Sequence, residues 1–232
     1  MDRPYIICHM VTSLDGKVTG NFLFDPECAK ACRIYYEINR KRKADGFICG
    51  RVTMEGSFTG GEKPDLSQCD EEIEKADFIP DDLTGFYAVS FDPKGKLGWK
   101  SARIEDPDGD PGYDGAQIVQ VLTHRAHGRY LTYLKKLGIA YVFAGEDEID
   151  VPLALSKLKN LFHCETLLLE GGSIVNGYFQ RADVIDEISL VVAPIVGEKD
   201  DKPLFDSAVK SQFSLSKAEE KSGNLILNYK RV

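Results

Sequence analysis

No stretch of this 232-residue sequence is apolar over enough residues to span a bilayer, which takes about 20 consecutive apolar residues. The apolar run at residues 5–11 is short, contains His9, and is not followed by a small-residue cleavage site. It therefore predicts a β-strand instead of a signal peptide. We expect a soluble protein of the cytoplasm that has no membrane partner.

Positive charge is in short supply. The chain has 29 Lys and Arg residues against 37 Asp and Glu residues, which gives a formal net charge of −8. Proteins that bind nucleic acids neutralise backbone phosphates with Lys and Arg, so this balance argues against a nucleic-acid partner. A small anionic substrate remains compatible with it, because a local basic pocket can form on an acidic protein.

Motifs that bind metals are also missing. None of the six cysteines forms a C-x-x-C pair, and no H-x-x-x-H pair is present. Cys28 and Cys32 lie four residues apart and could share a helix face, but no second cysteine pair accompanies them. We therefore expect reduced thiols, as in other cytoplasmic proteins, and no metal site.

Apolar, β-branched runs alternate with helical patterns along the chain, which is typical of an α/β protein with a mostly parallel sheet covered on both faces. The patterns predict strands at 5–11, 46–49, 86–90, 118–122, 140–144, 166–169 and 187–193. They predict helices at 27–43, 129–137, 152–162 and 173–181, the first of them capped by Asp25 and Pro26.

The end of the chain has a different pattern. Residues 213–221 and 225–232 flank Ser222, Gly223 and Asn224, and the second segment alternates apolar and polar residues. This arrangement predicts a C-terminal antiparallel hairpin. Since the composition does not change sharply anywhere, we expect a single domain that covers residues 1–232.

The strongest local motif is a strand that leads into two glycines and then a helix. Glu170 follows the apolar run 167–169, Gly171 and Gly172 come next, and Ser173 is placed to act as the N-cap. Glycines allow a positive φ and a close approach to a ligand, and the helix N-terminus directs free N–H groups to the same place. The motif therefore predicts a phosphate site, with a tight turn that binds nothing as the alternative.

Two other strands end in polar residues. The carboxyl ends of parallel strands meet at one edge of a sheet, where ligands bind. Several polar strand ends are therefore stronger evidence for a ligand site than a single one. An arginine beside a hydroxyl group or an imidazole suits the 2′-phosphate that distinguishes NADPH from NADH. The residues are Gly50, Arg51 and Thr53 at one junction, and Thr123, His124 and Arg125 at the other.

These junctions and several further motifs resemble the dihydrofolate-reductase-like superfamily, and most closely the reductase domain of the bifunctional deaminase–reductase of riboflavin biosynthesis. The motifs are S-L-D-G-K at 13–17, E-G-G at 170–172, D-E at 186–187 and A-P-I-V-G at 193–197. Their order and spacing fit over nearly the whole chain.

The resemblance implies a three-layer α/β/α fold with a mostly parallel central sheet and a C-terminal antiparallel hairpin. It also implies a homodimer that uses NADPH to reduce the ribose of 5-amino-6-(5-phosphoribosylamino)uracil to a ribityl chain. Hydride addition to the imine formed by ring opening needs a proton donor, and Asp15, Lys17 and Glu170 are the candidates.

The resemblance also assigns binding residues. Val11 and Thr12 would line the nicotinamide, while Asp25, Lys41 and Glu170 would face the substrate. Besides the two junctions described above, the cofactor phosphates would be held by the turn made of Gly171, Gly172, Ser173, Ile174, Val175 and Asn176.

The sequence departs from the family at the substrate side. The family's D-D-P-x-L-T-x-R element, which helps to grip the substrate phosphate, is absent from residues 55–64. A reductase of the same fold that acts on a pterin or on another imine or carbonyl therefore stays open, as does a non-catalytic NADP-binding protein. No H-x-E with P-C-x-x-C is present, so we expect no zinc deaminase in this chain.

Overall fold

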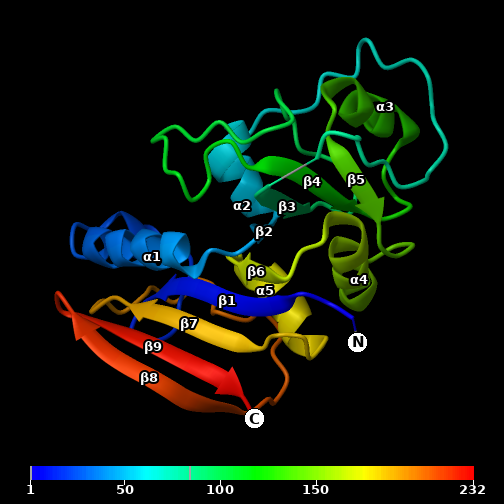
Figure 1. Cartoon of the computed structure of the whole chain (residues 1–232). Helices are drawn as coiled ribbons and strands as arrows, with labels where there is room; N and C mark the ends of the chain where they lie inside the picture. Colours follow the sequence, from blue (N-terminus) through cyan, green and yellow to red (C-terminus); the bar gives the residue numbers. More distant parts are fainter. Residues whose placement is uncertain (1, 84) are drawn as a thin grey trace. The chain divides into compact units, whose positions relative to one another are not determined.

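The computed structural model describes residues 2–83 and 85–232 (Figure 1) and consists of two compact units. Unit 1 comprises Met1–Pro4 and Ala44–Glu165, and unit 2 comprises Tyr5–Lys43 and Thr166–Val232. After residue 4 the chain forms the first part of unit 2, then nearly all of unit 1, and finally the rest of unit 2. Each unit is described by itself.

Unit 1 is built on four parallel strands, paired in the order β5 (Ala140–Phe143), β4 (Gln117–Leu122), β3 (Tyr87–Phe91) and β2 (Gly46–Gly50). Every residue of these strands is buried, as expected for parallel strands that are covered on both faces. The helices of the unit are α2 (Arg51–Met54), α3 (Gly128–Leu137) and α4 (Val151–Phe162), with the single π-helical turn η2 (Glu55–Thr59) after α2.

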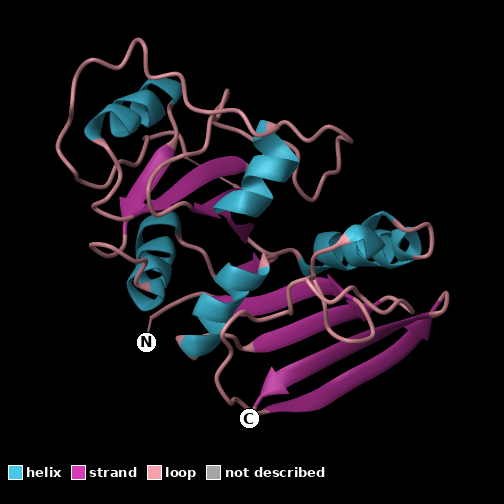
Figure 2. Cartoon of the chain, turned by 180° about the vertical axis from the view of Figure 1, so that it is seen from behind, coloured by secondary structure: helices cyan, strands magenta, loops and turns pink. Residues whose placement is uncertain are grey.

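Unit 2 contains five strands in the order β6 (Thr166–Leu169), β1 (Tyr5–Thr12), β7 (Glu187–Val192), β9 (Asn224–Arg231) and β8 (Phe213–Lys221). The first three are parallel, and β9 and β8 are antiparallel to their neighbours. Figure 2 shows these strands from behind in magenta. The helices are α1 (Cys28–Arg42), α5 (Ser173–Arg181) and the 3-10 turn η1 (Asn21–Phe24).

Helix α1 is fixed on unit 2 by an apolar cluster. Cys28, Ala31 and Ile34 of α1 are buried against side chains of β1, β7 and β9, among them Val191 and Ile226. Burial of a large aliphatic side chain such as Ile34 contributes about 1.5–3 kcal/mol, which outweighs the small intrinsic preference of one helix. This packing determines which polar side chains of α1 face the protein interior.

The structure confirms the α/β class, the parallel strands and the C-terminal hairpin. The hairpin turns through Ser222 and Gly223, whose φ angles of 54° and 79° are those of a two-residue type I′ turn. Predicted element boundaries agree with the observed ones or differ from them by one residue. The short helical turns η1 and η2 were not predicted, because elements of four or five residues carry little periodicity.

The start of α1 differs from the prediction. The helix begins at Cys28 with Glu27 as its N-cap residue, and Asp25 instead accepts a hydrogen bond from the Glu27 N–H at 2.8 Å. Asp25 therefore orders the turn that precedes the helix. Within the described residues, no helix has the length and apolar character that a membrane span requires.

Candidate functional site

The turn after β6 has the backbone that its two glycines predict. Gly171 has a φ of +94°, and the Gly171–Gly172 peptide bond is cis. A Cβ atom on Gly171 would lie 3.1 Å from the end of the Met10 side chain of β1, so a larger residue would be strained by its positive φ and would crowd Met10. Gly172, not Ser173, is the N-cap of α5, and Ser173 is the first residue of the helix. The prediction of a serine cap was wrong, because the glycine already has the extended backbone that a cap requires.

Two polar atoms at the start of α5 are buried without a hydrogen-bond partner among the described residues. They are Ser173 Oγ and Asn176 Oδ1, whereas Asn176 Nδ2 donates to the Leu204 carbonyl at 3.1 Å. Buried polar atoms in native proteins nearly always have a partner. Together with the free N–H groups of the helix N-terminus, these atoms fit a bound phosphate group. Val175 is buried in this turn, and Ile174 is exposed.

The S-L-D-G-K loop at residues 13–17 is closed by hydrogen bonds through Asp15. Its Oδ1 accepts from Ser13 Oγ at 2.6 Å and from the Gly197 N–H at 2.8 Å. These donors, the Ser13 hydroxyl foremost, hold the pKa of the Asp15 carboxyl below its ordinary value. Asp15 is therefore ionised at neutral pH and is better suited to ordering the loop than to donating a proton.

Lys17 is held by the segment that follows β7. Its Nζ donates to the Asp201 carbonyl at 3.1 Å, and its backbone forms a bridge with Pro203. A Cβ on Gly197 would come within 2.5 Å of Lys17 Cγ, so this glycine makes room for the lysine side chain. Of the two loop residues that were proton-donor candidates, Lys17 is the one whose side chain donates a hydrogen bond, whereas Asp15 accepts hydrogen bonds.

Glu170 is buried and accepts a hydrogen bond on Oε1 from Asn39 Nδ2 of α1 at 2.7 Å. The sequence interpretation did not single out Asn39. The available signal was its spacing, since Asn39 follows Ala31 and Tyr35 at steps of four and so lies on the inward face of α1. Asn39 fixes one carboxylate oxygen of Glu170.

The structure does not place Asp25 and Lys41 with Glu170. Asp25 is exposed and precedes the N-terminus of α1, whereas Asn39 lies near the other end of a helix roughly 22 Å long. Lys41 is exposed and follows Asn39 by two residues, which is about 200° around the helix. Lys41 therefore faces the β8–β9 hairpin rather than Glu170.

Thr12 and Val11 end β1. Both are buried, and Val11 belongs to the apolar cluster beneath α1. Thr12 pairs with Val192 in the parallel register, and its carbonyl accepts from the Ala193 N–H at 2.8 Å. Any contact of Val11 with a ligand is therefore through the backbone, since its side chain packs in the core.

In unit 1, a cavity of about 440 Å³ adjoins the end of β2. Arg51, Lys63 and Lys96 line it together with Pro64 and Gly95. Glu55 pairs with Arg51 and with Lys63, each at 2.5 Å, and these contacts, the one from Lys63 foremost, lower the pKa of Glu55. Glu55 pairs with two of the three cations, and the buried Asp92 interacts with Arg51 and Lys96, while the cavity lining itself is cationic and suits an anion such as a phosphate.

The residues around Glu55 occupy the place in the sequence where the D-D-P-x-L-T-x-R element was expected. The segment that lacks D-D-P-x-L-T-x-R forms the π-helical turn η2, and Gly60 follows it with a φ of +59°. Thr53, the third residue of the first junction, lies in the preceding α2 turn, for which Gly50 is the N-cap. The ion pairs of Glu55 with Arg51 and Lys63 thus hold the two ends of the segment 51–63 together.

The loop after β3 carries Lys96 and is ordered by Asp92 and Thr123. Asp92 is fully buried, and its Oδ2 accepts from the N–H groups of Lys96 and Leu97 at 2.5 and 3.0 Å. Burial raises the pKa of Asp92. Thr123 Oγ1 donates to the Pro93 carbonyl at 2.7 Å. Lys96, Lys63 and Asp92 were not predicted, because a loop lysine and a turn aspartate carry no pattern of their own.

His124 lies beside β5, and neither His124 nor Arg125 lines the Arg51 cavity. His124 stacks on Phe143 with ring centroids 4.9 Å apart, and its Nε2 is 3.8 Å from Glu146. Arg125 is exposed. The structure therefore brings Arg51 together with Lys63 and Lys96, while Thr123 supports the loop that presents Lys96.

Residues 113–227 match the family model described as the RibD C-terminal domain. Two proteins named 2,5-diamino-6-ribosylamino-4(3H)-pyrimidinone 5′-phosphate reductase are similar over most of the chain. The protein from Aquifex aeolicus is 25% identical over 202 residues, which cover 84% of this chain and 79% of that protein. The protein from Methanothermobacter thermautotrophicus is 27% identical over 208 residues, which cover 88% and 84%.

Among solved structures, RibD of Acinetobacter baumannii is similar over 100% of this chain, with a TM-score of 0.67 at 17% identity. The chain spans 59% of the length of that protein. This likeness concerns the fold alone, and it agrees with the predicted α/β class.

The lowered pKa of Asp15 predicts how its contribution to stability depends on pH. A carboxyl whose pKa is lowered by folding stabilises the native state above its unfolded value of about 3.9. That contribution disappears as the pH falls through the lower folded value. We expect Asp15→Asn to lower Tm by a constant amount between pH 6 and 7 and by progressively less below about pH 4. The measurement is Tm against pH for both proteins.

Asp200→Asn is the control, since Asp200 is exposed and its side chain makes no hydrogen bond with the described residues. Its Tm difference from the wild type should be small throughout. A difference for Asp15→Asn that persists undiminished to pH 2 would contradict the assignment.

Proposed function

We propose that this chain, which is similar to two pyrimidinone phosphate reductases and matches the RibD C-terminal domain model over residues 113–227, is an oxidoreductase of riboflavin biosynthesis that reduces a ribosylaminopyrimidine 5′-phosphate with NADPH. The observation that carries the proposal is the pairing of buried Glu170 with Asn39, directly before the Gly171 turn. We also propose that residues 1–232 act as one reductase domain.

The substrate class follows from the names of the relatives, which act on the 2,5-diamino-pyrimidinone. The uracil derivative expected from the motifs differs from it only by an oxo group in place of the 2-amino group. We propose the diamino compound as the preferred substrate. Both compounds carry the ribosylamine on which the reaction takes place.

A nicotinamide cofactor fits the residues present, and when bound it supplies the hydride. We propose that the start of α5, with the unpartnered Ser173 Oγ and Asn176 Oδ1, holds a cofactor phosphate. Arg51, Lys63 and Lys96 line a cavity with surplus positive charge, which favours the extra phosphate of NADPH over NADH.

The remaining chemistry is the handling of one proton. Ring opening of the ribosylamine leaves a C=N bond, so that hydride adds to carbon and a proton goes to nitrogen. We propose Lys17 Nζ as the proton source, positioned by the Asp201 carbonyl. Glu170 would accept a hydrogen bond from the substrate, and ionised Asp15 would keep the loop closed.

The cofactor proposal predicts that Lys96→Gln and Arg51→Gln each weaken NADPH binding about tenfold, or about 1.4 kcal/mol, and leave NADH binding unchanged. The reason is that each variant removes a cation from the cavity proposed to bind the extra phosphate of NADPH. The residues proposed to bind the part that NADPH and NADH share are unchanged. Nicotinamide fluorescence titrations with both dinucleotides measure the effect.

Lys100→Gln is the matched control, because Lys100 is an exposed lysine of the same loop region that pairs with Glu62 outside this cavity. Gly172→Asp, which adds a carboxylate at the start of α5, should weaken the binding of both dinucleotides. Equal losses of NADPH and NADH affinity in Lys96→Gln would rule out the assigned phosphate position.

The catalytic proposal is tested by incubating the whole chain with NADPH and the diamino-pyrimidinone ribosylamine phosphate. We expect NADPH consumption to match formation of the ribityl product, measured by mass spectrometry, and to be slower with the uracil derivative. Asn39→Leu should lower kcat/KM roughly tenfold or more, because it removes the Asn39 hydrogen bond that fixes the buried Glu170 carboxylate.

Two variants separate positioning of Glu170 from a general loss of structure. Asn39→Asp places a like charge beside Glu170, so the acid limb of the pH–rate profile should move to higher pH. Asn160→Leu, the same change at an exposed asparagine of α4, should leave kcat/KM unchanged. If the wild type consumes NADPH with neither compound, the substrate class is wrong, and imines or pterins are tested next.

We also propose a homodimer formed through β8. This strand ends the sheet order of unit 2, its side chains are mostly exposed, and Leu215 is 53% exposed. An edge strand of this length presents unpaired backbone groups that a second copy can pair. Light scattering should give twice the chain mass of 25.8 kDa, and Leu215→Arg should shift it toward one chain mass. A monomeric wild type at micromolar concentration would refute the dimer.

A further inference from the structure

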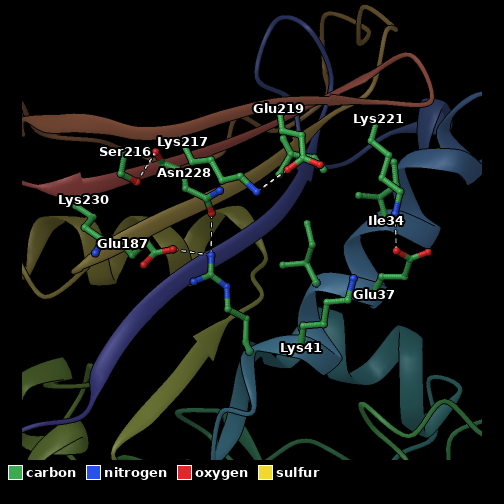
Figure 3. A pocket seen from close by; sticks show the side chains of 13 residues that line it. Ile34, Glu37, Lys41, Glu187, Ser216, Lys217, Glu219, Lys221, Asn228 and Lys230 are labelled. Atoms are coloured by element: carbon green, nitrogen blue, oxygen red, sulfur yellow. Dashed lines mark hydrogen bonds and ion pairs between the residues drawn. The ribbon is translucent and has the colours of Figure 1, made fainter.

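A groove of about 460 Å³ lies in unit 2 between α1 and the β8–β9 hairpin (Figure 3). Its floor is apolar and is formed by Ile34, Ile38 and Ile226, of which Ile34 and Ile226 are buried. Its rim is polar and strongly charged. The charged residues that line it are Glu37, Lys41, Arg42, Glu187, Lys217, Glu219, Lys221 and Lys230.

All three carboxylates of the groove are already paired. Arg42 Nη2 lies 2.5 Å from Glu187 Oε1, Lys217 Nζ lies 2.5 Å from Glu219, and Lys221 Nζ lies 2.6 Å from Glu37. Figure 3 shows these contacts as dashed lines. The Lys221–Glu37 pair joins α1 to the hairpin, the Arg42–Glu187 pair joins α1 to β7, and the Lys217–Glu219 pair lies within β8.

Two lysines of the groove are not part of these ion pairs. Lys41 and Lys230 form no ion pair with any residue that the structure describes, although both line the cavity. Figure 3 shows the Lys41 side chain extending from α1 toward the hairpin, while Lys230 extends from β9 beside Glu187. The groove thus has a surplus of two positive charges in a chain whose net charge is −8.

We propose that this groove is a second anion site, which binds a phosphomonoester attached to an apolar body. The doubly charged phosphate would balance Lys41 and Lys230, and the apolar body would cover Ile34, Ile38 and Ile226. Arg42 adds a guanidinium that Glu187 and Asn228 already hold in position, with Asn228 Oδ1 accepting at 2.8 Å. A cation held in this way loses little conformational freedom when it binds a phosphate.

The groove is separate from the Glu170 carboxylate, although both are on unit 2. Asn39 points from α1 to Glu170, whereas Lys41 lies about 200° further around the same helix and lines the groove. The two sites therefore use different faces of α1. A ligand in the groove would contact the helix that positions Glu170 without meeting Glu170 itself.

The test is a titration of the whole chain with 1-naphthyl phosphate in the presence of saturating NADP⁺, followed by naphthyl fluorescence and by calorimetry. Lys41→Gln and Lys230→Gln should each weaken binding about fivefold, because each removes one charge that balances the phosphate. Glu219→Gln should strengthen it, since that variant releases Lys217 from its ion pair. Uncharged 1-naphthol should bind at least tenfold more weakly.

Two controls locate the bound probe. Lys210→Gln removes an exposed positive charge of unit 2 outside the groove and should leave the affinity unchanged. Glu170→Gln should also retain the affinity, which distinguishes the groove from the proposed substrate site. Binding that is lost in Glu170→Gln but kept in Lys41→Gln and Lys230→Gln would overturn the proposal while leaving the reductase function standing. Absence of any binding to the wild type would also overturn it.

Discussion

The arrangement of unit 2 depends on the hydrogen bonds made by the segment of residues 195–206. On one side this segment binds the S-L-D-G-K loop, where the Gly197 N–H donates to Asp15 and the Leu204 N–H donates to the Gly16 carbonyl at 3.0 Å. On the other side it binds α5, where Asn176 Nδ2 donates to the Leu204 carbonyl. One segment therefore connects the proposed proton donor loop with the proposed phosphate site.

Packing against the same segment also explains why positions 177 and 197 are glycines, which the motifs alone do not explain. A Cβ on Gly177 of α5 would lie 2.1 Å from the Asp206 carbonyl, and one on Gly197 would overlap the Lys17 side chain. Both glycines allow close packing of the backbone and leave no room for larger residues. Rigid support of this kind is what a site needs, because misplacing a proton donor by about 1 Å is enough to slow a reaction strongly.

Much of the fold could be predicted from the sequence, because apolar periodicity and turn chemistry are local. The Gly171 turn, the type I′ hairpin at Ser222 and the parallel strands all follow from residues adjacent in the chain. The N-cap of α5 was missed by one residue, since both Gly172 and Ser173 are acceptable caps and only the backbone angles decide between them.

The side-chain contacts of the site could not be predicted in the same way. Asn39 and Glu170 are 131 positions apart, and nothing in the sequence near either one indicates that they pair. Lys41 was expected to face the substrate, and only the packing of α1 shows that it lines a groove instead. The cations of the Arg51 cavity come from three separate segments of unit 1, so their proximity follows from the tertiary structure.

The two basic cavities show how an acidic chain can bind anions. In each, a carboxylate neutralises part of the positive charge and at the same time fixes the cations, as Glu55 does for Arg51 and Glu187 does for Arg42. Affinity should therefore follow the surplus of positive charge and its rigidity rather than the number of cations. At physiological ionic strength, charges are screened beyond about 8 Å, so the net charge of −8 weakens such a site little. Local charge and geometry then decide which anion binds.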